Sequence, residues 1–449
     1  MLLKRKFYLL LFVFLITTLS ICAQNFSPPE WSYDKTIYEV NIRQYSPGGT
    51  IKEFETHLPR LKEMGVGILW LMPIHPIGVE NRKGTLGSYY SVKDYTMVNP
   101  EFGTAEDFKS LVNKIHSMGM FVIIDWVANH TAWDHKWISE HPEFYTKDSL
   151  GNIIPPVPDW SDVADLNFGD KELWTEMIKA LRYWVEEFDI DGYRCDVAGM
   201  IPIEFWLEAR KELEKVKNVF MLAEWETPEM HFVFDMTYDW TAHKLMNNIY
   251  KGEKNVHDFV NHFADNKNNY FSNAFRMQFT SNHDENSWNG TEFERLGKAA
   301  ETFAVLSFLV PGMPLIYSGQ EAGLNKRLLF FEKDEIEWHD HPSTELYTKL
   351  IALKKNNRAL FNGNKGSELL ELISSDSVHT FAFTREVDED KILSVFNLSG
   401  KKSGFSLNGK NLIGTYKNYF TGNIETFEET ENFELEPWEY RVYIKSGQQ

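Results

Sequence analysis

Apolar positions along most of the chain follow two alternating patterns. Over residues 51–61 every third or fourth position is apolar, and the apolar run ILWLMPI follows at 68–74. The first pattern predicts an amphipathic helix, and the second predicts a parallel strand that is buried on both faces. The same helix-then-strand unit recurs before the runs that end at Asp125 and Asp196.

The apolar runs supply enough strands for a closed barrel. The candidates are the runs ending at Asp125 and Asp196 and the segments 37–42, 68–74, 219–224, 234–238, 275–280 and 314–318. They make eight or nine strands, and 234–238 is the one that we would leave out. About eight strands alternating with helices predict an α/β fold, a (β/α)8 TIM barrel, whose usual size is ~250 residues before insertions.

Two regions depart from the barrel pattern. Residues 131–165 follow the third strand and are rich in Pro, Trp, Asp and His. Loops longer than ~12–15 residues tend to be functional, so this segment is interpreted as an inserted loop subdomain over the barrel mouth. Short alternating runs over 361–449 predict a C-terminal antiparallel β-sandwich. The catalytic barrel then comprises 24–130 and 166–360.

The N-terminal segment 1–23 predicts a secretory signal peptide. It contains three basic residues, an apolar run and then small residues up to Ala23, and the run is shorter than the ~20 residues that cross a bilayer. We therefore expect export to the periplasm or the exterior, with no transmembrane segment in the mature chain. Lipid anchoring at Cys22 is the alternative. Without the signal, Cys195 is the only thiol, so no intrachain disulfide can form.

Composition narrows the classes of partner. Hydrophobic residues make up 43% of the chain and charged residues 25%, which is typical of globular proteins and excludes a disordered or fibrous chain. Asp and Glu number 65 against 46 Lys and Arg, giving a formal charge of −19. Such a surface repels phosphate backbones, so we expect no nucleic-acid partner.

Acidic residues lie at or just after the ends of four apolar runs: Asp125, Asp196, Glu224 and Asp284. In a (β/α)8 barrel the carboxyl ends of the strands form the active site, so these four side chains are expected to meet at one mouth. Clustered carboxylates without a His/Cys ligand set suit the cleavage of a glycosidic bond, which needs one acid and one carboxylate. A divalent-metal site built from bare carboxylates is the alternative.

Five segments, of which four contain one of these acids, resemble the α-amylase family, glycoside hydrolase family 13, in matching order. They are DWVANH at 125–130, VADLNF at 163–168, GYRCD at 192–196, LAEWE at 222–226 and SNHDE at 281–285. The resemblance covers nearly the whole mature chain. It implies a retaining O-glycosyl hydrolase in which Asp196 is the nucleophile, Glu224 the general acid and base, and Asp284 the stabiliser of the transition state.

The resemblance also implies roles for polar neighbours of the carboxylates. His130 and His283 match positions that hydrogen-bond sugar hydroxyls, and Tyr90 matches the aromatic residue that stacks on the sugar ring, with Tyr89 as the competing candidate. Arg194 lies two positions before the nucleophile, so on a strand both side chains point into the mouth. Its guanidinium would keep that carboxylate ionised.

For other motif residues, a structural role competes with a direct role in catalysis or sugar binding. Asp125 is expected to hold the framework of the site rather than to react. Trp225 and Trp288 line outer sugar subsites or belong to the core. The chemistry requires no cofactor. The resemblance offers Asn129 as a ligand for a structural calcium ion. The Lys-His pair that accompanies it in the family is replaced by 197–200, VAGM, which counts against calcium binding.

The expected substrate is starch or a maltooligosaccharide cleaved at α-1,4 bonds, because Val163 stands where Gln would indicate α-1,6 specificity. Within the family, a transglycosylase or a cyclodextrin- or pullulan-degrading enzyme is the alternative. From another class, a non-catalytic glycan-binding or scaffold protein would use the same barrel, but such proteins typically lose carboxylates.

Overall fold

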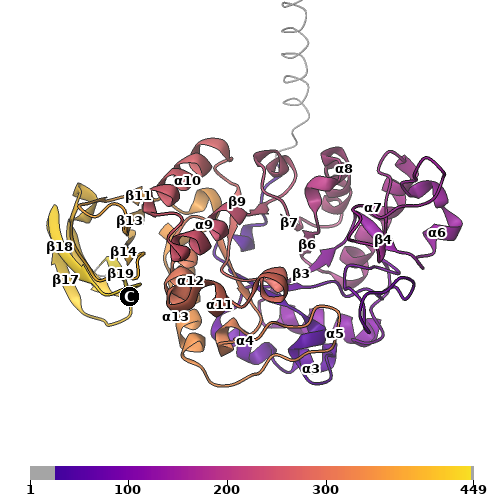
Figure 1. Ribbon diagram of the computed structural model, residues 1–449, viewed down its shortest axis with the longest axis horizontal. Coiled ribbons are helices and arrows are strands. Elements are labelled where there is room, and N and C mark those ends of the chain that lie inside the picture. Colours follow the sequence, from indigo (N-terminus) through magenta and orange to yellow (C-terminus); the bar gives the residue numbers. More distant parts are fainter. Residues whose placement is uncertain (1–25, 446–449) are drawn as a thin grey trace, which may run out of the picture.

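The computed structural model describes residues 26–445, so the predicted signal peptide and Cys22 lie outside the described residues. Eight parallel strands close into a barrel in chain order, as predicted from the sequence (Figure 1). The barrel strands are β1 (Ile37–Val40), β2 (Ile68–Leu71), β3 (Phe121–Trp126), β6 (Gly192–Cys195), β7 (Phe220–Ala223), β8 (Met236–Tyr238), β9 (Phe275–Gln278) and β10 (Met313–Tyr317).

The prediction that 234–238 is not a barrel strand is wrong, because β8 lies between β7 and β9 in the closed barrel. Met236 pairs with Leu222 on one side and with Phe275 on the other. The strand has three residues, and only the 3-10 turn Pro228–Phe232 separates it from β7. The helix that marks the other units is therefore missing here, which removed the periodic signal.

Helices cover the outside of the barrel, most of them between successive strands and α13 after the last one (Figure 1). They are α2 (Ile42–Tyr45), α3 (Ile51–Glu55), α4 (Leu58–Met64), α5 (Ala105–Ser117), α7 (Lys171–Phe188), α8 (Ile203–Glu214), α9 (Trp240–Lys251), α10 (Val256–Asn269), α11 (Glu292–Leu296), α12 (Ala300–Leu309) and α13 (Pro342–Asn356). Local sequence fixes their ends. Thr104 and Asp107 form a capping box that starts α5, and Gly65, at a φ of 96°, ends α4 in the left-handed conformation.

The barrel interior is filled by side chains, as expected for this architecture. One buried cluster contains Ile37, Ile68, Ile123, Leu222 and Met277 from five different strands. Glycine permits one close approach, since a Cβ on Gly192 would lie 1.9 Å from the carbonyl oxygen of Phe220.

The segment after β3 forms a small lobe beside the mouth. It contains the antiparallel pair β4 (His130–Ala132) and β5 (Val163–Asp165) and the short helix α6 (Trp137–Glu140). Lys83, from the loop after β2, binds Asp162 at 3.0 Å and ties this lobe to the barrel. The exact domain limits at 131 and 165 stay predictions.

Antiparallel sheets form the C-terminal region, consistent with the predicted β-sandwich (yellow in Figure 1). One sheet has the order β11-β13-β14-β19-β16-β17 and the other β12-β15-β18. Their bounds are β11 (Leu370–Glu371), β12 (Ile373–Ser374), β13 (Thr380–Val387), β14 (Asp390–Asn397), β15 (Ser403–Asn408), β16 (Gly414–Asn418), β17 (Ile424–Phe427), β18 (Thr430–Leu435) and β19 (Tyr440–Lys445). Leu393, Leu407 and Tyr443 from both sheets share a buried cluster.

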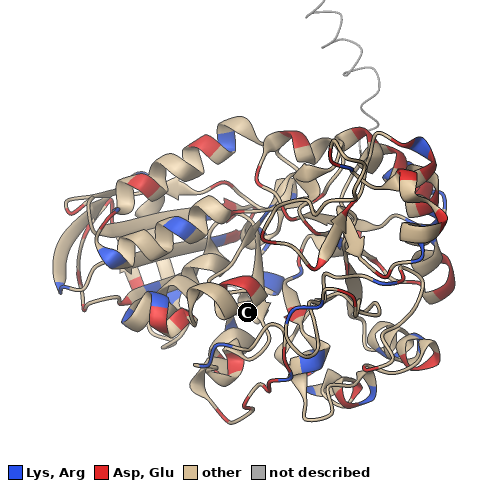
Figure 2. Ribbon diagram, turned by 45° about the vertical axis from the view of Figure 1, so that its right-hand side comes forward, with Lys and Arg blue, Asp and Glu red and all other residues tan. Residues whose placement is uncertain are grey.

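Charged residues of both signs are spread over the molecule (Figure 2). Blue Lys and Arg positions stand among the red Asp and Glu positions and do not gather into one band. Within residues 26–445, no helix combines the length and the apolar character that crossing a bilayer would need.

Candidate active site

The carboxylates at the strand ends converge on Arg194, which β6 places in the mouth with its side chain fully buried. Nη1 of Arg194 lies 2.8 Å from Oδ1 of Asp125 and 2.9 Å from Oδ1 of Asp196. Nη2 lies 2.9 Å from Oε1 of Glu224. Nε donates to the hydroxyl of Tyr238 at 3.2 Å. One guanidinium therefore fixes three carboxyl groups from β3, β6 and β7 relative to each other.

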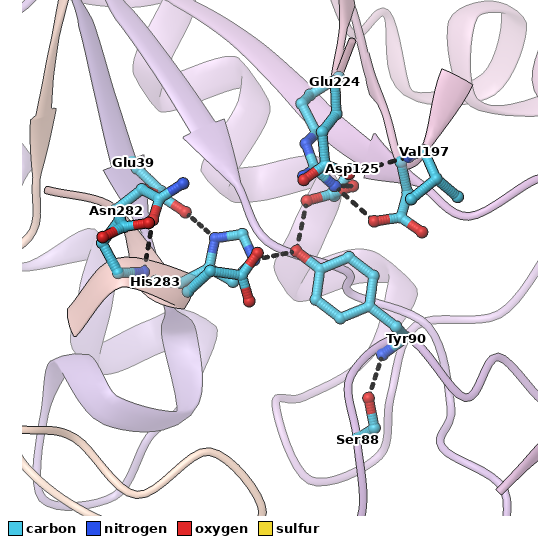
Figure 3. A network of polar contacts seen from close by, with 12 residues as sticks. Glu39, Ser88, Tyr90, Asp125, Val197, Glu224, Asn282 and His283 are labelled. Carbon is cyan, nitrogen blue, oxygen red and sulfur yellow. Dashed lines mark hydrogen bonds and ion pairs between the residues drawn. The ribbon is translucent and has the colours of Figure 1, made fainter. Parts of the chain in front are cut away.

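Glu224 is held from two sides. Its Oε1 faces Arg194, and its Oε2 accepts the backbone N–H of Val197 at 2.8 Å (Figure 3). Val197 follows Asp196 directly and has a φ of 36° and a ψ of 44°, a left-handed conformation that is strained for a β-branched residue. The turn after β6 therefore positions both the Asp196 carboxyl and the donor that orients Glu224.

Tyr90 and His283 lie together on the other side of the site. The hydroxyl of Tyr90 donates to Oδ2 of Asp125 at 3.1 Å and lies 2.8 Å from Nε2 of His283 (Figure 3). Nδ1 of His283 is 2.5 Å from Oε1 of Glu39 on β1. Asp284 is 3.5 Å from Nε2 of His283 and is more exposed than the other carboxylates, at 36% of its side chain.

The remaining sequence candidates occupy the edge of this group. His130 begins β4, is buried, and contacts the ring of Trp160 edge-on at 5.5 Å between centroids. Burial lowers the pKa of His130 to about 4, so it is neutral near pH 7. The competing Tyr89 is buried beneath Arg43, whose guanidinium lies 4.2 Å from the centre of its ring. Tyr90 is therefore the tyrosine whose hydroxyl reaches the carboxylates.

Burial sets the protonation of the carboxyl groups. Burial raises the pKa of Glu224 to about 7; Arg194 opposes the shift and Asp196 adds to it. For Asp196, burial raises the pKa to about 6 against the pull of Arg194, with Asp125 as a further charge. A hydrogen bond with Glu224 stabilises the ionised form of Asp196. A proton is therefore favoured on Glu224 while Asp196 is ionised, as one acid and one nucleophile require.

His283 is a cation near neutral pH. Burial opposes its charge, but Asp284 and Glu39 outweigh the burial and raise its pKa to about 9. Both ring nitrogens then carry protons, so Nδ1 donates to Glu39 and Nε2 donates to Tyr90. The mouth thus combines two buried cations with a ring of carboxylates.

Comparison with known proteins identifies the family of the chain. Residues 25–150 and 158–444 match the family described as "Alpha amylase, catalytic domain". The chain belongs to the α-amylase family. It is accordingly an O-glycosyl hydrolase of glycoside hydrolase family 13.

Relatives of this α-amylase family member match over most of its length. Alpha-amylase 2 of Dictyoglomus thermophilum is 28% identical, over 90% of this chain and 75% of the relative. The noncanonic maltogenic alpha-amylase AmyB from Thermotoga neapolitana has 31% identity and a TM-score of 0.85, over 92% and 98% of the two chains. An alpha-amylase from Lactobacillus plantarum has 32% identity and a TM-score of 0.82, with the same coverage.

Three residues of this amylase site were missed in the sequence. Glu39 lies within the apolar run of β1, Trp70 within that of β2, and Tyr238 on the strand that was left out. Trp70 donates its indole N–H to Oδ2 of Asp125 at 3.2 Å. A charged residue inside the otherwise apolar IYEV was a usable signal for Glu39, because a buried acid needs a partner. Trp70 carried no such signal.

The two tryptophan candidates differ in their surroundings. Trp225 is half-buried and packs against Gly199, where an added Cβ would lie 2.1 Å from its ring. Trp288 is 53% exposed in the π-helical turn Glu285–Asn289 directly after Asp284. Neither is a fully buried core residue.

The surroundings of Asn129 bear on the expected calcium site. The side-chain amide of Asn129 lies 3.2 Å from Nδ1 of His130. In the part of the chain from 26 to 445, no three His, Cys, Asp or Glu side chains are grouped in a way that would bind a metal ion. An ion held by amide and backbone carbonyl oxygens falls outside this grouping, so a structural calcium at Asn129 stays a prediction.

Proposed function

We propose that this protein cleaves α-1,4-glucosidic bonds in starch or maltooligosaccharides with retention of the anomeric configuration. The observation that carries the proposal is the binding of Asp196 and Glu224 to the same guanidinium, at 2.9 Å each. Carboxyls held on the two terminal nitrogens of one guanidinium favour the ~5–5.5 Å separation of a retaining pair over the ~6.5–9.5 Å that an inverting pair needs for an intervening water.

In the first step, the oxygen of Asp196 that does not bind Arg194 attacks the anomeric carbon. The bond from this carbon to the bridging oxygen breaks, and Glu224 gives its proton to that oxygen, so the leaving sugar departs as an alcohol. Arg194 keeps Asp196 ionised before the attack. The product is a glycosyl ester on Asp196, with Glu224 ionised.

In the second step, water gives a proton to Glu224 and its oxygen attacks the same carbon from the opposite face to the ester. The ester bond breaks, Asp196 leaves as a carboxylate, and Glu224 is protonated again. Two inversions restore the original configuration. Asp284, on the same mouth, is suited to stabilise the positive charge that develops on the sugar ring in both steps.

The other residues hold the sugar. Tyr90 offers a ring whose hydroxyl is tethered by Asp125 and His283, so its face is fixed for stacking. Nε2 of the His283 cation donates to Tyr90 in the free protein, and a sugar hydroxyl would have to share or take over this proton. His130 is neutral at the lobe side. Val163, the residue that favours α-1,4 over α-1,6 linkages, is buried in β5.

The proposal is tested by product analysis. Starch, cyclodextrin, pullulan and maltotriose are each incubated with the protein, and the first products are identified by chromatography and by NMR of the anomeric proton. We expect α-anomers from α-1,4 bonds. β-Anomers would contradict retention, cleavage of pullulan only at its 1,6 bonds would contradict the linkage, and early products longer than maltotriose would indicate a transglycosylase.

A variant pair tests the catalytic assignment. Asp196→Asn is expected to lower kcat by at least ~10³-fold, because it removes the nucleophile and keeps its size. Asp148→Asn is the matched control, since Asp148 lies in an exposed turn of the lobe. Asn can keep the Oδ1 acceptor for the backbone N–H groups of Leu150 and Asn152, and only the exposed bond from the Asn152 side chain is lost. Unchanged activity of Asp196→Asn would contradict the proposed mechanism.

We also propose that the protein is exported, with residues 1–23 as the signal peptide. The motif in the sequence supports this, and fractionation of cells that produce the full chain would test it. Enzyme that stays in the cytoplasm with its N-terminus intact would contradict the proposal. Labelling with a radioactive fatty acid would separate a soluble form from lipid anchoring at Cys22.

A further inference from the structure

Trp288 is an exposed aromatic side chain at the mouth of the barrel. The turn Glu285–Asn289 carries it directly after Asp284, and its exposed fraction is 53%. Single exposed apolar residues are common on protein surfaces and need no explanation. This one differs because other rings connect it to the site.

A continuous row of rings leads from Trp288 to the sugar-facing tyrosine. Phe330 lies 5.1 Å from Trp288 between ring centroids. Phe330 also neighbours Tyr90, at 6.2 Å and with only 15° between the planes. Phe330 also lies 6.4 Å from His283. The row therefore starts in solvent and ends within the site.

The row is held in place before any ligand arrives. Oδ1 of Asn286 accepts the backbone N–H of Leu328 at 2.8 Å, and Ser287 donates its hydroxyl to the carbonyl of Leu328 at 2.9 Å. On the far side, the backbone N–H of Leu86 donates to the carbonyl of Phe331 at 3.1 Å. A preformed surface of this kind costs little ordering when it binds a ring.

The position of the row indicates which sugars it would contact. Glu224 protonates the oxygen of the leaving sugar, and Val197 holds Glu224 on one side of Tyr90 (Figure 3). His283, which Phe330 contacts, lies on another side of Tyr90, beside Glu39 and apart from Glu224 and Val197 (Figure 3). The row thus continues from Tyr90 away from the leaving group, where the part of the substrate retained on Asp196 extends.

We propose that Trp288 and Phe330 form a binding site for the second sugar ring of the retained part of the substrate, next to the ring that stacks on Tyr90. The ligand is an α-1,4-linked glucose unit that presents its apolar C–H face to the exposed ring of Trp288. This inference rests on the proposed function, because it takes Glu224 as the acid on the leaving-group side.

The experiment compares two substrates with the same aryl leaving group, an aryl α-glucoside with one retained ring and an aryl α-maltoside with two. Trp288→Ala is expected to lower kcat/KM for the maltoside about tenfold and to leave the glucoside unchanged. Trp288→Phe, which keeps a flat ring, is expected to recover most of the loss. Phe271→Ala is the matched control, since Phe271 is 46% exposed and pairs with Phe232, not with the row.

Each possible result either supports or contradicts the second-ring site. A loss confined to the maltoside, with an unchanged melting temperature, supports the second-ring site. Equal losses on both substrates, or no loss on either, overturn it. If the unmodified protein forms no glycosyl-enzyme with either substrate, the proposed function fails first, and the site proposed here falls with it.

Discussion

Val197 donates its backbone N–H to Oε2 of Glu224 at 2.8 Å from a left-handed conformation with a φ of 36°. The residue before it is Asp196, so one strained peptide segment connects the proposed nucleophile to the proposed acid. Non-glycine residues pay about 1–2 kcal/mol for this conformation. The strain persists because Arg194 and the neighbouring strands fix the chain on both sides.

The strain predicts an unusual order of stability at position 197. In regular structure Gly is less stable than Ala by roughly 0.5–1 kcal/mol, because it loses more backbone freedom on folding. Here we expect Val197→Gly to be about 1 kcal/mol more stable than Val197→Ala, since only Gly escapes the left-handed penalty. Urea unfolding of the two variants measures the difference. An alanine variant as stable as the glycine variant would show that the backbone is not strained.

The carboxyl pKa values predict a narrow pH optimum. Asp196, with a pKa of about 6, must lose its proton to attack, so kcat/KM should rise as the pH passes 6. Glu224, with a pKa of about 7, must keep its proton, so kcat/KM should fall as the pH passes 7. A pH profile on maltotriose at constant ionic strength measures both limbs. A plateau that extends to pH 9 would contradict the assignment of Glu224.

The rate loss caused by removing the acid Glu224 should depend on the leaving group of the substrate. Glu224→Gln is expected to slow the cleavage of maltotriose by ~10²–10⁴-fold, because the bridging oxygen then leaves without a proton. A dinitrophenyl α-glycoside needs no such proton, so its first step should be nearly unaffected. Without the base for the second step, the glycosyl ester on Asp196 should accumulate and be visible by mass spectrometry. Equal slowing of both substrates would argue against the acid role.

The charge on His283 can be tested through Glu39. Burial disfavours the cation, and Asp284 and Glu39 raise its pKa to about 9. Glu39→Gln removes one of these two charges, so we expect the pKa of His283 to fall toward its ordinary value. NMR titration of the ring protons measures this shift. The control is Glu55→Gln on α3, a position outside the His283 network.

The His283–Glu39 pair also predicts how the free energy of unfolding changes with pH. Because the folded-state pKa of His283 lies above its unfolded value of ~6.5, its contribution is fully present below about pH 6.5 and is lost as the pH rises through 9. The unmodified protein should therefore lose more unfolding free energy between pH 6.5 and 9 than Glu39→Gln does. Parallel pH dependences in the two proteins would contradict the link.

Some features of the fold and the site could be predicted from the pattern of apolar and polar residues along short stretches of the chain. The barrel was predicted because buried parallel strands read as continuous apolar runs, and helices keep their own period. The carboxylates at strand ends were predictable because the barrel brings those ends together. Strand β8 was not predicted as a barrel strand. Its three residues are too few to show a strand pattern, and no α-helix lies between it and β7.

The sequence by itself determined the barrel, its C-terminal sheets, the family, and the candidates Asp196, Glu224 and Asp284, since these depend on local period and on motif order. Only the tertiary structure decided that Arg194 binds three carboxyls, that Glu39 charges His283, and that Phe330 joins Trp288 to Tyr90. These relations join residues far apart in the chain. The physical reason is that burial and charge act through distance in space, which barrel closure sets and sequence spacing does not.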